Sequence, residues 1–265
     1  MTIELFHNSM STCSQKVRVT LAEKGQEFIS HHFNLRAGDQ HKPEYLAINP
    51  NGVVPTIIHD RKVVYESAVI DEYLEDLFPN PPLRSFKPFE RARMRLWIKQ
   101  LDEGLHAASA TISACIAFRY QFMEGKNEQQ VKATLDGYVD PLKRKRMTEN
   151  VLNGIGSQFF KPAIQRIFKM VDEMERALQD CPWISGPEFS LADIAFAPYV
   201  TRLLHLHQDW AFETRPKLAS WLECIQNRES YKKGMKDWFD PDFLTLMAEK
   251  GRESQKRVKV VLNSS

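Results

Sequence analysis

The chain has 265 residues, 43% of them hydrophobic and 26% charged, with a formal net charge of +2. This is an ordinary globular composition with room for one large or two modest domains, and so small a charge argues against nucleic acid as the main partner. No run approaches the roughly 18 apolar residues of a membrane span, and the four cysteines lie too far apart to suggest a disulfide framework or a metal site.

The first part of the chain alternates strand and helix patterns. Thr2–Phe6 predicts a short strand with no leader ahead of it, which favours a cytoplasmic protein. A helix that contains Val17 and Leu21 follows and ends at Gly25, whose lack of a side chain suits a helix end. Phe28–Leu35 predicts a second strand.

Two apolar runs further on, VVPTIIHD and RKVVYES, are split by Asp60-Arg61 and predict a β-hairpin. The run SAVIDEYLEDLF then has helical spacing. The order β-α-β, loop, β-β-α is that of a thioredoxin-like unit, in which helices cover a four-stranded sheet. We assign this unit to residues 1–80 and expect its active site at the N-terminus of the first helix.

The rest of the chain predicts a second, all-α domain over residues 89–265, so the fold class is α/β plus all-α. Prolines between Pro79 and Pro88 mark the linker. An apolar stripe from Met94 to Cys115 predicts one helix of about 30 residues. The polar segment near 119–158 is an insertion, either a mobile lid or a pair of short helices. We expect the basic C-terminal end, GRESQKRVKVVLNSS, to be partly disordered.

The cluster Ser11-Thr12-Cys13-Ser14 stands at the start of the first predicted helix. A helix N-terminus stabilises an anion by roughly 0.3–1 kcal/mol, and a hydroxyl donor adds about 1.5–3 kcal/mol. Together they lower the pKa of a bound thiol by about one to two units from its usual value near 8.5. The pattern therefore favours activation of a thiolate by Ser11 or Ser14, and the hydroxyl that is not used caps the helix.

Two other motifs carry weaker signals. Ser190 and Asp193 fit a capping box, which is a structural device. Val54-Pro55 opens the third strand, where a proline needs an edge, a turn or a cis bond. With a cis bond, the Val54 backbone pairs with a peptide ligand.

Two further groups suit the two ends of such a ligand. Glu66 and Ser67 stand at a strand-to-helix junction and suit an α-amino acid head group, although a plain N-cap explains them equally well. Gln40, His41 and Lys42 offer donors for a second carboxylate, with a solvated loop as the structural alternative.

These motifs together resemble a cytosolic glutathione transferase over nearly the whole chain. The stretches STCSQKVR, NPNGVVPTI, VVYESAVIDEYLEDLFP and ISGPEFSLADIAFAPYV occur in the order and spacing of that family. The resemblance implies glutathione as co-substrate. It also implies that Glu66 and Ser67 hold the γ-glutamyl head, Val54 and Pro55 the cysteinyl backbone, and Gln40 and His41 the glycyl carboxylate.

Within the family the chain is most similar to bacterial β-etherases, which cleave lignin-derived aryl ethers. The stretches INPNGVVPTIIHDRKVVYESAVIDEYLEDLFP and RARMRLWIKQLDE and the long polar insertion carry this similarity. In that group Asn-Ser faces the glutathione sulfur, so Ser14 corresponds directly, whereas Cys13 replaces the asparagine.

Two other classes are also similar at the first helix. STCSQKVR resembles the motif of zeta-class maleylacetoacetate isomerases, whose first serine corresponds to Ser11. Those enzymes carry Gln-Ser where this chain has Glu66-Ser67, and they lack the insertion, so this class ranks second. Beta-class enzymes use a cysteine at the place of Cys13 to form mixed disulfides, but Ser11 and Ser14 stand where redox relatives have the cysteines of C-x-x-C, which disfavours thiol transfer.

The resemblance implies that a small aromatic substrate sits between the two domains, and that the protein is a homodimer or a heterodimer. A glutathione-binding subunit without catalytic activity is the alternative from another class. The basic run Lys143–Arg146 fits a solvated surface better than a nucleic-acid patch, and we expect neither a metal nor a membrane. The candidate substrate-pocket residues are His7, Asn8, Met10, His106, Ser109, Ser113 and Tyr120.

Overall fold

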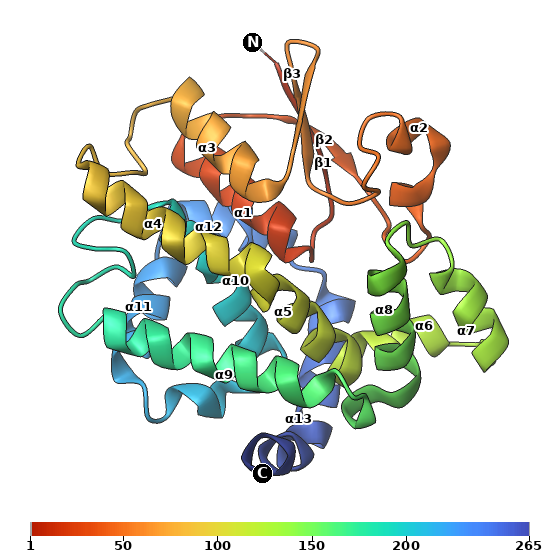
Figure 1. Cartoon of the computed structure of the whole chain (residues 1–265). Helices are drawn as coiled ribbons and strands as arrows, with labels where there is room; N and C mark the ends of the chain where they lie inside the picture. Colours follow the sequence, from red (N-terminus) through yellow and green to blue (C-terminus); the bar gives the residue numbers. More distant parts are fainter. Residues whose placement is uncertain (1, 265) are drawn as a thin grey trace.

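The computed structural model describes residues 2–264 and divides them into a sheet-containing unit and a helical unit (Figure 1). The sheet has the order β2-β1-β3-β4. Strand β1 pairs in parallel with β2, and antiparallel pairing joins β1 to β3 and β3 to β4. The strands are β1 (Ile3–His7), β2 (Ile29–His32), β3 (Thr56–His59) and β4 (Lys62–Tyr65).

Alternating side chains of the strands build two separate cores. Leu5 and Ile57 face α1 (Thr12–Glu23) and α3 (Ser67–Leu77), where they pack with Leu21 and Leu74. On the opposite face Phe6, Ile58 and Val54 pack with Tyr45 of the short helix α2 (Pro43–Leu46). This period of two is expected of a sheet covered on both faces. The thioredoxin-like unit is thereby confirmed.

The expected hairpin between β3 and β4 is also present. Asp60 and Arg61 form its two-residue loop with φ of 48° and 63°. Positive φ at both positions is the geometry of a type I′ turn, whose twist matches that of the paired strands. The Val54-Pro55 bond is cis, which is one of the three settings expected for a proline at the start of the third strand.

The helical unit is built around α10, which is buried along almost its whole length among the surrounding helices. Ser190 and Asp193 form the expected capping box at its start. The all-helical character of this half is confirmed. Its helices are α4 (Pro88–Gln100), α5 (His106–Ser113), α6 (Arg119–Met123), α7 (Glu128–Leu135), α8 (Pro141–Asn153), α9 (Phe160–Ala177), α10 (Leu191–His205), α11 (Pro216–Gln226), α12 (Glu229–Gly234) and α13 (Pro241–Asn263).

The predicted continuous helix of about 30 residues is wrong. After α4 the chain passes through a π-helical turn, Leu101–Leu105, in which Gly104 has a φ of 109°. A second π-helical turn, Ala114–Phe118, separates α5 from α6. The apolar stripe continues across both irregularities because each short helix still turns its apolar side to the same core.

The expectation of a partly disordered C-terminal end is also wrong. Helix α13 runs to Asn263, and Val258 is fully buried in the main core. Within residues 2–264, no helix combines the length and the apolar character that crossing a bilayer requires.

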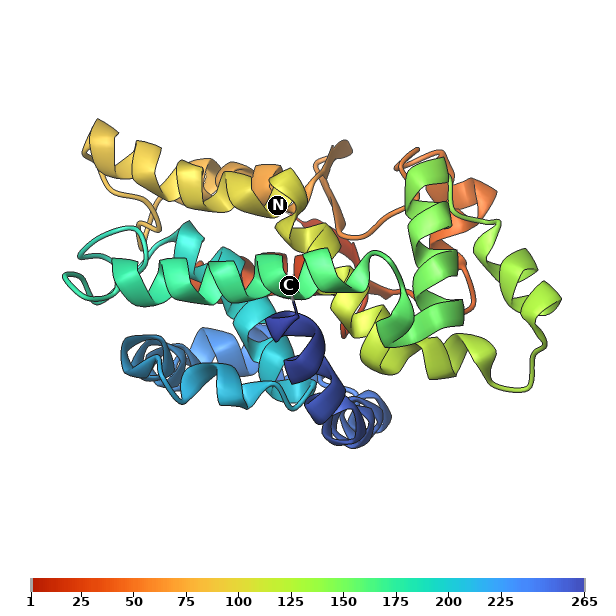
Figure 2. The same cartoon turned by 60° about the horizontal axis from the view of Figure 1, so that its bottom comes forward.

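The insertion forms a small lobe of α6, α7 and α8 with its own core of Phe122, Val131, Leu135 and Val151. It is thus a set of short helices, one of the two forms expected. Figures 1 and 2 both place α8 of this lobe beside α2 of the sheet-containing unit. The insertion therefore borders the region where the two units meet.

Candidate active site

The loop before α1 is held in place by a buried arginine. Arg18 donates to the carbonyl oxygens of Asn8 (3.0 Å), Ser9 (2.8 Å) and Gly234 (2.8 Å). Gly234 lies so close to α1 that a Cβ there would be 2.6 Å from the Val19 nitrogen. Since these contacts join the loop to both units, the first turn of α1 has a fixed position relative to the helical unit.

Ser11 and Ser14 have different surroundings. Ser11 is the N-cap of α1, where its Oγ accepts the Ser14 N–H (3.3 Å). It lines the cavity between the two units, and its hydroxyl donates to no residue in the range 2–264. Ser14 is completely buried behind it, with its Oγ accepting the Asn8 N–H (3.3 Å), and does not line the cavity. Of the two serines expected as thiolate donors, Ser11 is therefore the one whose hydroxyl reaches the cavity.

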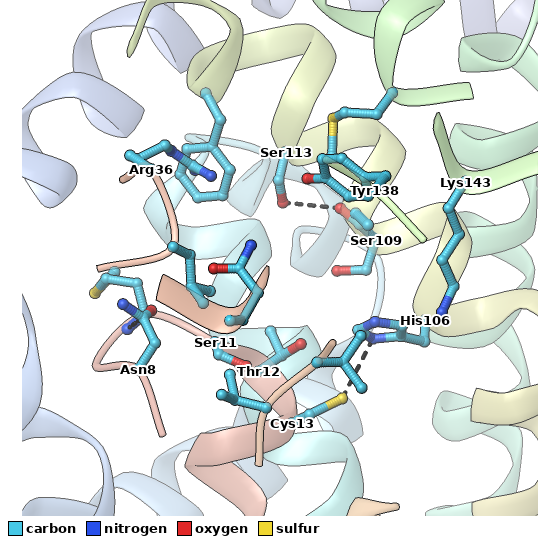
Figure 3. Close-up of a pocket in the computed structure, with 18 of the residues that line it drawn as sticks. Asn8, Ser11, Thr12, Cys13, Arg36, His106, Ser109, Ser113, Tyr138 and Lys143 are labelled. Carbon is cyan, nitrogen blue, oxygen red and sulfur yellow. Dashed lines mark hydrogen bonds between the residues drawn. The ribbon is translucent and has the colours of Figure 1, made fainter. Parts of the chain in front are cut away.

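The cavity has a volume of about 500 Å³ and lies between the start of α1, the loop after β2, helix α5 and the insertion. Figure 3 shows Ser11, Thr12 and Cys13 on one side and His106 of α5 opposite them. Ser109 and Ser113 extend the same side of α5, since they follow His106 at helical spacing. The cavity is large enough for a tripeptide and a small aromatic molecule together.

Three residues expected to bind glutathione line the cavity, namely Gln40, His41 and Val54. Gln40 is buried, and burial also lowers the pKa of His41, so its ring is neutral at pH 7. Pro55 follows Val54 through the cis bond and does not line the cavity itself.

Glu66 and Ser67 stand at the start of α3 beside the cavity and are not part of its lining. Asn51, which does line it, donates to Glu66 Oε1 at 3.4 Å. Glu66 adopts a φ of 70°, which a residue with a side chain seldom adopts, and such positions cluster at ligand sites. The pair therefore borders the site next to Asn51.

Cys13 contacts two side chains of the helical unit. Its Sγ lies 3.6 Å from His106 Nδ1 and 3.9 Å from the Tyr199 hydroxyl, and these two groups are 3.0 Å apart. Burial alone would raise the pKa of the Cys13 thiol, but the charges of His106 and Lys16 outweigh it and lower the pKa to about 5. Cys13 is therefore a thiolate at neutral pH. Within residues 2–264, no group of three or more His, Cys, Asp or Glu side chains is placed to hold a metal ion.

Two of the expected substrate-pocket residues lie elsewhere. His7 is fully buried against Arg18, Phe28 and Trp238, and burial lowers its pKa to about 3. Tyr120 of α6 is 43% exposed and does not line the cavity. The other expected residues, Asn8, Met10, His106, Ser109 and Ser113, do line the cavity.

The cationic and aromatic groups on the side of the cavity formed by the helical unit were not predicted from the sequence. Arg36, Arg202 and Tyr138 line the cavity, as does Lys143 of α8. Arg202 carried a signal, since it is a charged residue in an otherwise apolar helix and such a residue requires a buried polar partner. Arg36 and Tyr138 lie in polar segments that offered no comparable signal.

The insertion also contacts the expected glutathione residues. The Tyr138 ring packs against the His41 ring with centroids 5.5 Å apart, and Gly137 lies directly over the same imidazole. The lobe thereby closes the cavity above His41. The polar composition of the insertion did not predict this role.

Two family models match the chain. The glutathione S-transferase N-terminal domain matches residues 10–77, and the glutathione S-transferase C-terminal domain matches residues 128–224. Together they span most of the sheet-containing unit and much of the helical unit.

Curated relatives and solved structures agree with these models. Protein LigF of a Sphingobium strain is 30% identical over 94% of this chain and 99% of its own length. The crystal structure of the β-etherase LigF from Sphingobium superposes with a TM-score of 0.81 over 89% of this chain and 100% of that one, at 29% identity. The glutathione S-transferase TCHQD of Arabidopsis thaliana is 25% identical over 90% of this chain and 91% of its own length. The chain therefore belongs to the glutathione S-transferase family.

Proposed function

We propose that this protein binds glutathione, stabilises its thiolate through Ser11 and transfers it to an aromatic electrophile, namely a β-aryl ether. The observation that carries the proposal is the position of the Ser11 hydroxyl, which caps α1, faces the cavity and has no acceptor in residues 2–264. A hydroxyl and a helix N-terminus directed at the same point stabilise a thiolate.

Glutathione lies along the sheet side of the cavity in this proposal. The neutral His41 ring and the Gln40 amide donate to the glycyl carboxylate, and the Val54 backbone pairs with the cysteinyl residue. Ser67 donates to the γ-glutamyl carboxylate while Glu66 accepts from the ammonium group. The sulfur then reaches the start of α1, since the cysteinyl residue lies between the two ends.

The reaction is a single displacement. The thiolate sulfur attacks the β carbon, a carbon–sulfur bond forms, and the ether carbon–oxygen bond breaks. The phenolate leaves with the bonding electron pair and takes a proton from water, so the products are a glutathione thioether and a phenol. The protein contributes binding energy, orientation and a stabilised nucleophile.

The ether substrate is supported by the similarity to a protein described as a β-etherase and by the aromatic walls of the cavity, Phe118, Tyr138 and Phe243. A zeta-like maleylacetoacetate isomerase and a non-catalytic glutathione-binding subunit are the alternatives. Only the etherase forms a thioether and releases a phenol in equal amounts.

The test is incubation of the protein with glutathione and each enantiomer of a β-aryl ether ketone, followed by quantification of phenol and thioether. We expect release from one enantiomer, none without glutathione, and a one-to-one product ratio. If maleylacetoacetate is isomerised and no phenol appears, the protein is an isomerase. If glutathione binds and neither reaction occurs, the protein is a binding subunit.

Cys13 supports a second candidate, glutathione-dependent thiol transfer. Its thiolate lines the cavity close to His106. In such a reaction the Cys13 sulfur attacks oxidised glutathione, forms a mixed disulfide and releases one glutathione thiolate. Mass spectrometry after treatment with oxidised glutathione tests this candidate. A mixed disulfide on Cys13 that glutathione reduces at a catalytic rate would support it, and an unmodified Cys13 would reject it.

Members of the family are generally dimers. We propose a cytoplasmic homodimer here, and light scattering of the purified chain tests its mass. A stable monomer that dimerises only with a second, different chain would indicate the heterodimer instead.

A further inference from the structure

Two guanidinium groups reach the cavity on its helical side. Arg202 of α10 is only 4% exposed, and it donates to Ser113 Oγ (3.1 Å) and to the Met10 carbonyl oxygen (2.6 Å). Its Nε is buried and has no hydrogen-bond partner in residues 2–264. An orphaned donor on a buried cation indicates that the site lacks a group it is built to receive.

Arg36 stands in the same region, in the segment after β2. Its Nε donates to Gln121 Oε1 (2.9 Å), and neither terminal amino group has a partner among the described residues. The guanidinium carbon lies 4.8 Å from the Phe118 ring centroid, 4.5 Å from that of Phe122 and 5.7 Å from that of Phe243. These rings hold Arg36 in place through cation–π contacts.

No carboxylate in residues 2–264 pairs with either arginine. Two acidic residues line the cavity, and each caps a helix. Asp140 Oδ1 accepts the N–H groups of Leu142 and Lys143 at the start of α8, and Asp240 Oδ1 accepts those of Asp242 and Phe243 at the start of α13. Burial lowers the pKa of both Arg36 and Arg202 to about 10, and for Arg202 the charge of Arg36 acts in the same direction. Two desolvated cations near each other are unfavourable, and a bound anion removes much of that penalty.

Glutathione does not account for this pair under the proposed function. Its carboxylates lie at Gln40 and His41 and at Ser67, on the sheet side. The contacts of Arg36, by contrast, are with α6, α13 and the π-helical turn before α6. The two guanidinium groups therefore belong to the part of the cavity that takes the second substrate.

We propose that Arg36, supported by Arg202, binds a carboxylate on the second substrate, so that the preferred electrophile is an aromatic ether acid. The inference rests on the proposed function for the position of glutathione. The planar guanidinium of Arg36 offers its two free amino groups to both carboxylate oxygens, and Phe118 and Phe243 flank the aromatic ring. A neutral ether of the same size leaves both cations without a counter-charge.

The test measures binding without reaction, by calorimetry on the full chain saturated with S-methylglutathione. The probes are two α-phenoxyacetophenones with a para carboxylate, one on each ring, and their methyl esters. We expect at least one acid to bind roughly tenfold or more tightly than its ester. Arg36→Gln removes this preference, and Arg36→Lys retains part of it. Arg215→Gln, at an arginine outside this cavity that pairs with Asp172, leaves the preference unchanged.

Equal binding of acids and esters by the unmodified protein overturns the inference, and this comparison does not depend on the folding of any variant. A preference that survives Arg36→Gln also overturns it, as does a loss of S-methylglutathione affinity in that variant. If phenol release fails while Arg36 still selects the acid, the proposed ether chemistry fails and the carboxylate site stands.

Discussion

The sheet side of the cavity takes its groups from short continuous stretches, whereas the helical side collects single residues from distant elements. Ser11 and Cys13 come from one helical turn, and Gln40 and His41 are neighbours in the chain. His106, Tyr138 and Arg202, by contrast, meet only because α5, the insertion and α10 pack together. A site built from local stretches can be recognised in the sequence, but a site assembled by packing requires the structure.

The largest expected effect concerns the capping box that anchors α10. Asp193 accepts the N–H groups of Ile184 (3.0 Å) and Ser190 (3.0 Å) and the Trp221 indole N–H (2.9 Å). Asp193→Ala leaves these buried donors unpaired and lowers the free energy of unfolding by about 3–4 kcal/mol. Denaturant unfolding measures the loss, and the exposed Asp180→Ala serves as the control.

Asp193→Ala also tests whether the two sides of the cavity are independent. Because α10 carries Tyr199 and Arg202, the helical side of the cavity should loosen first, while glutathione binding changes less. Equal loss of affinity for glutathione and for the aromatic substrate would show that the two sides are not separable.

The next effect separates two serines of the same turn. Ser11→Ala removes the hydroxyl that faces the cavity and lowers kcat/KM roughly 10- to 100-fold. Ser14→Ala removes a buried acceptor of the Asn8 N–H, and we expect a loss of stability with little change in rate at saturating glutathione. Steady-state kinetics of both variants show which serine stabilises the thiolate. A larger loss of kcat/KM in Ser14→Ala than in Ser11→Ala would contradict the proposed role of Ser11.

The order of the elements and the family motifs predicted the fold because strand alternation, turn residues and helix caps are local properties. The same locality explains why Gln40, His41 and Val54, which line the cavity and are proposed to bind glutathione, could be named from motifs. The sequence could not decide between Ser11 and Ser14 because a spacing of three residues does not say which hydroxyl faces the cavity. The break at Gly104 escaped notice because the apolar stripe continues across it.

A third prediction concerns the contact between the two sides. The pKa of Cys13 is lowered to about 5, so its rate of alkylation by iodoacetamide stays high from pH 8 down to about 6 and falls as the thiolate is protonated below pH 5. His106→Gln removes the nearest charge across the cavity and raises the midpoint by about one unit or more. Peptide mass spectrometry follows Cys13, and Cys115, whose pKa burial raises to about 12, is the unreactive internal control. If the pH midpoint of Cys13 alkylation is the same in His106→Gln, His106 does not lower the pKa of Cys13.

The smallest effect concerns the insertion. Tyr138→Ala removes the ring that packs on His41 and raises KM for glutathione roughly two- to tenfold, with kcat nearly unchanged. Initial rates over a range of glutathione concentrations provide the measurement, and Tyr120→Ala, outside the cavity, is the matched control. If both substitutions act alike, the lobe does not close the glutathione site.

The central claim is that Ser11 stabilises the thiolate of bound glutathione. Its most direct test is a pH titration of the thiolate ultraviolet absorbance of bound glutathione in three proteins. These are Cys13→Ser alone and Cys13→Ser combined with Ser11→Ala or with Ser14→Ala. We predict a bound-thiol pKa below that of free glutathione, raised by about one to two units in Ser11→Ala and unchanged in Ser14→Ala. An unchanged pKa in Ser11→Ala would contradict the account.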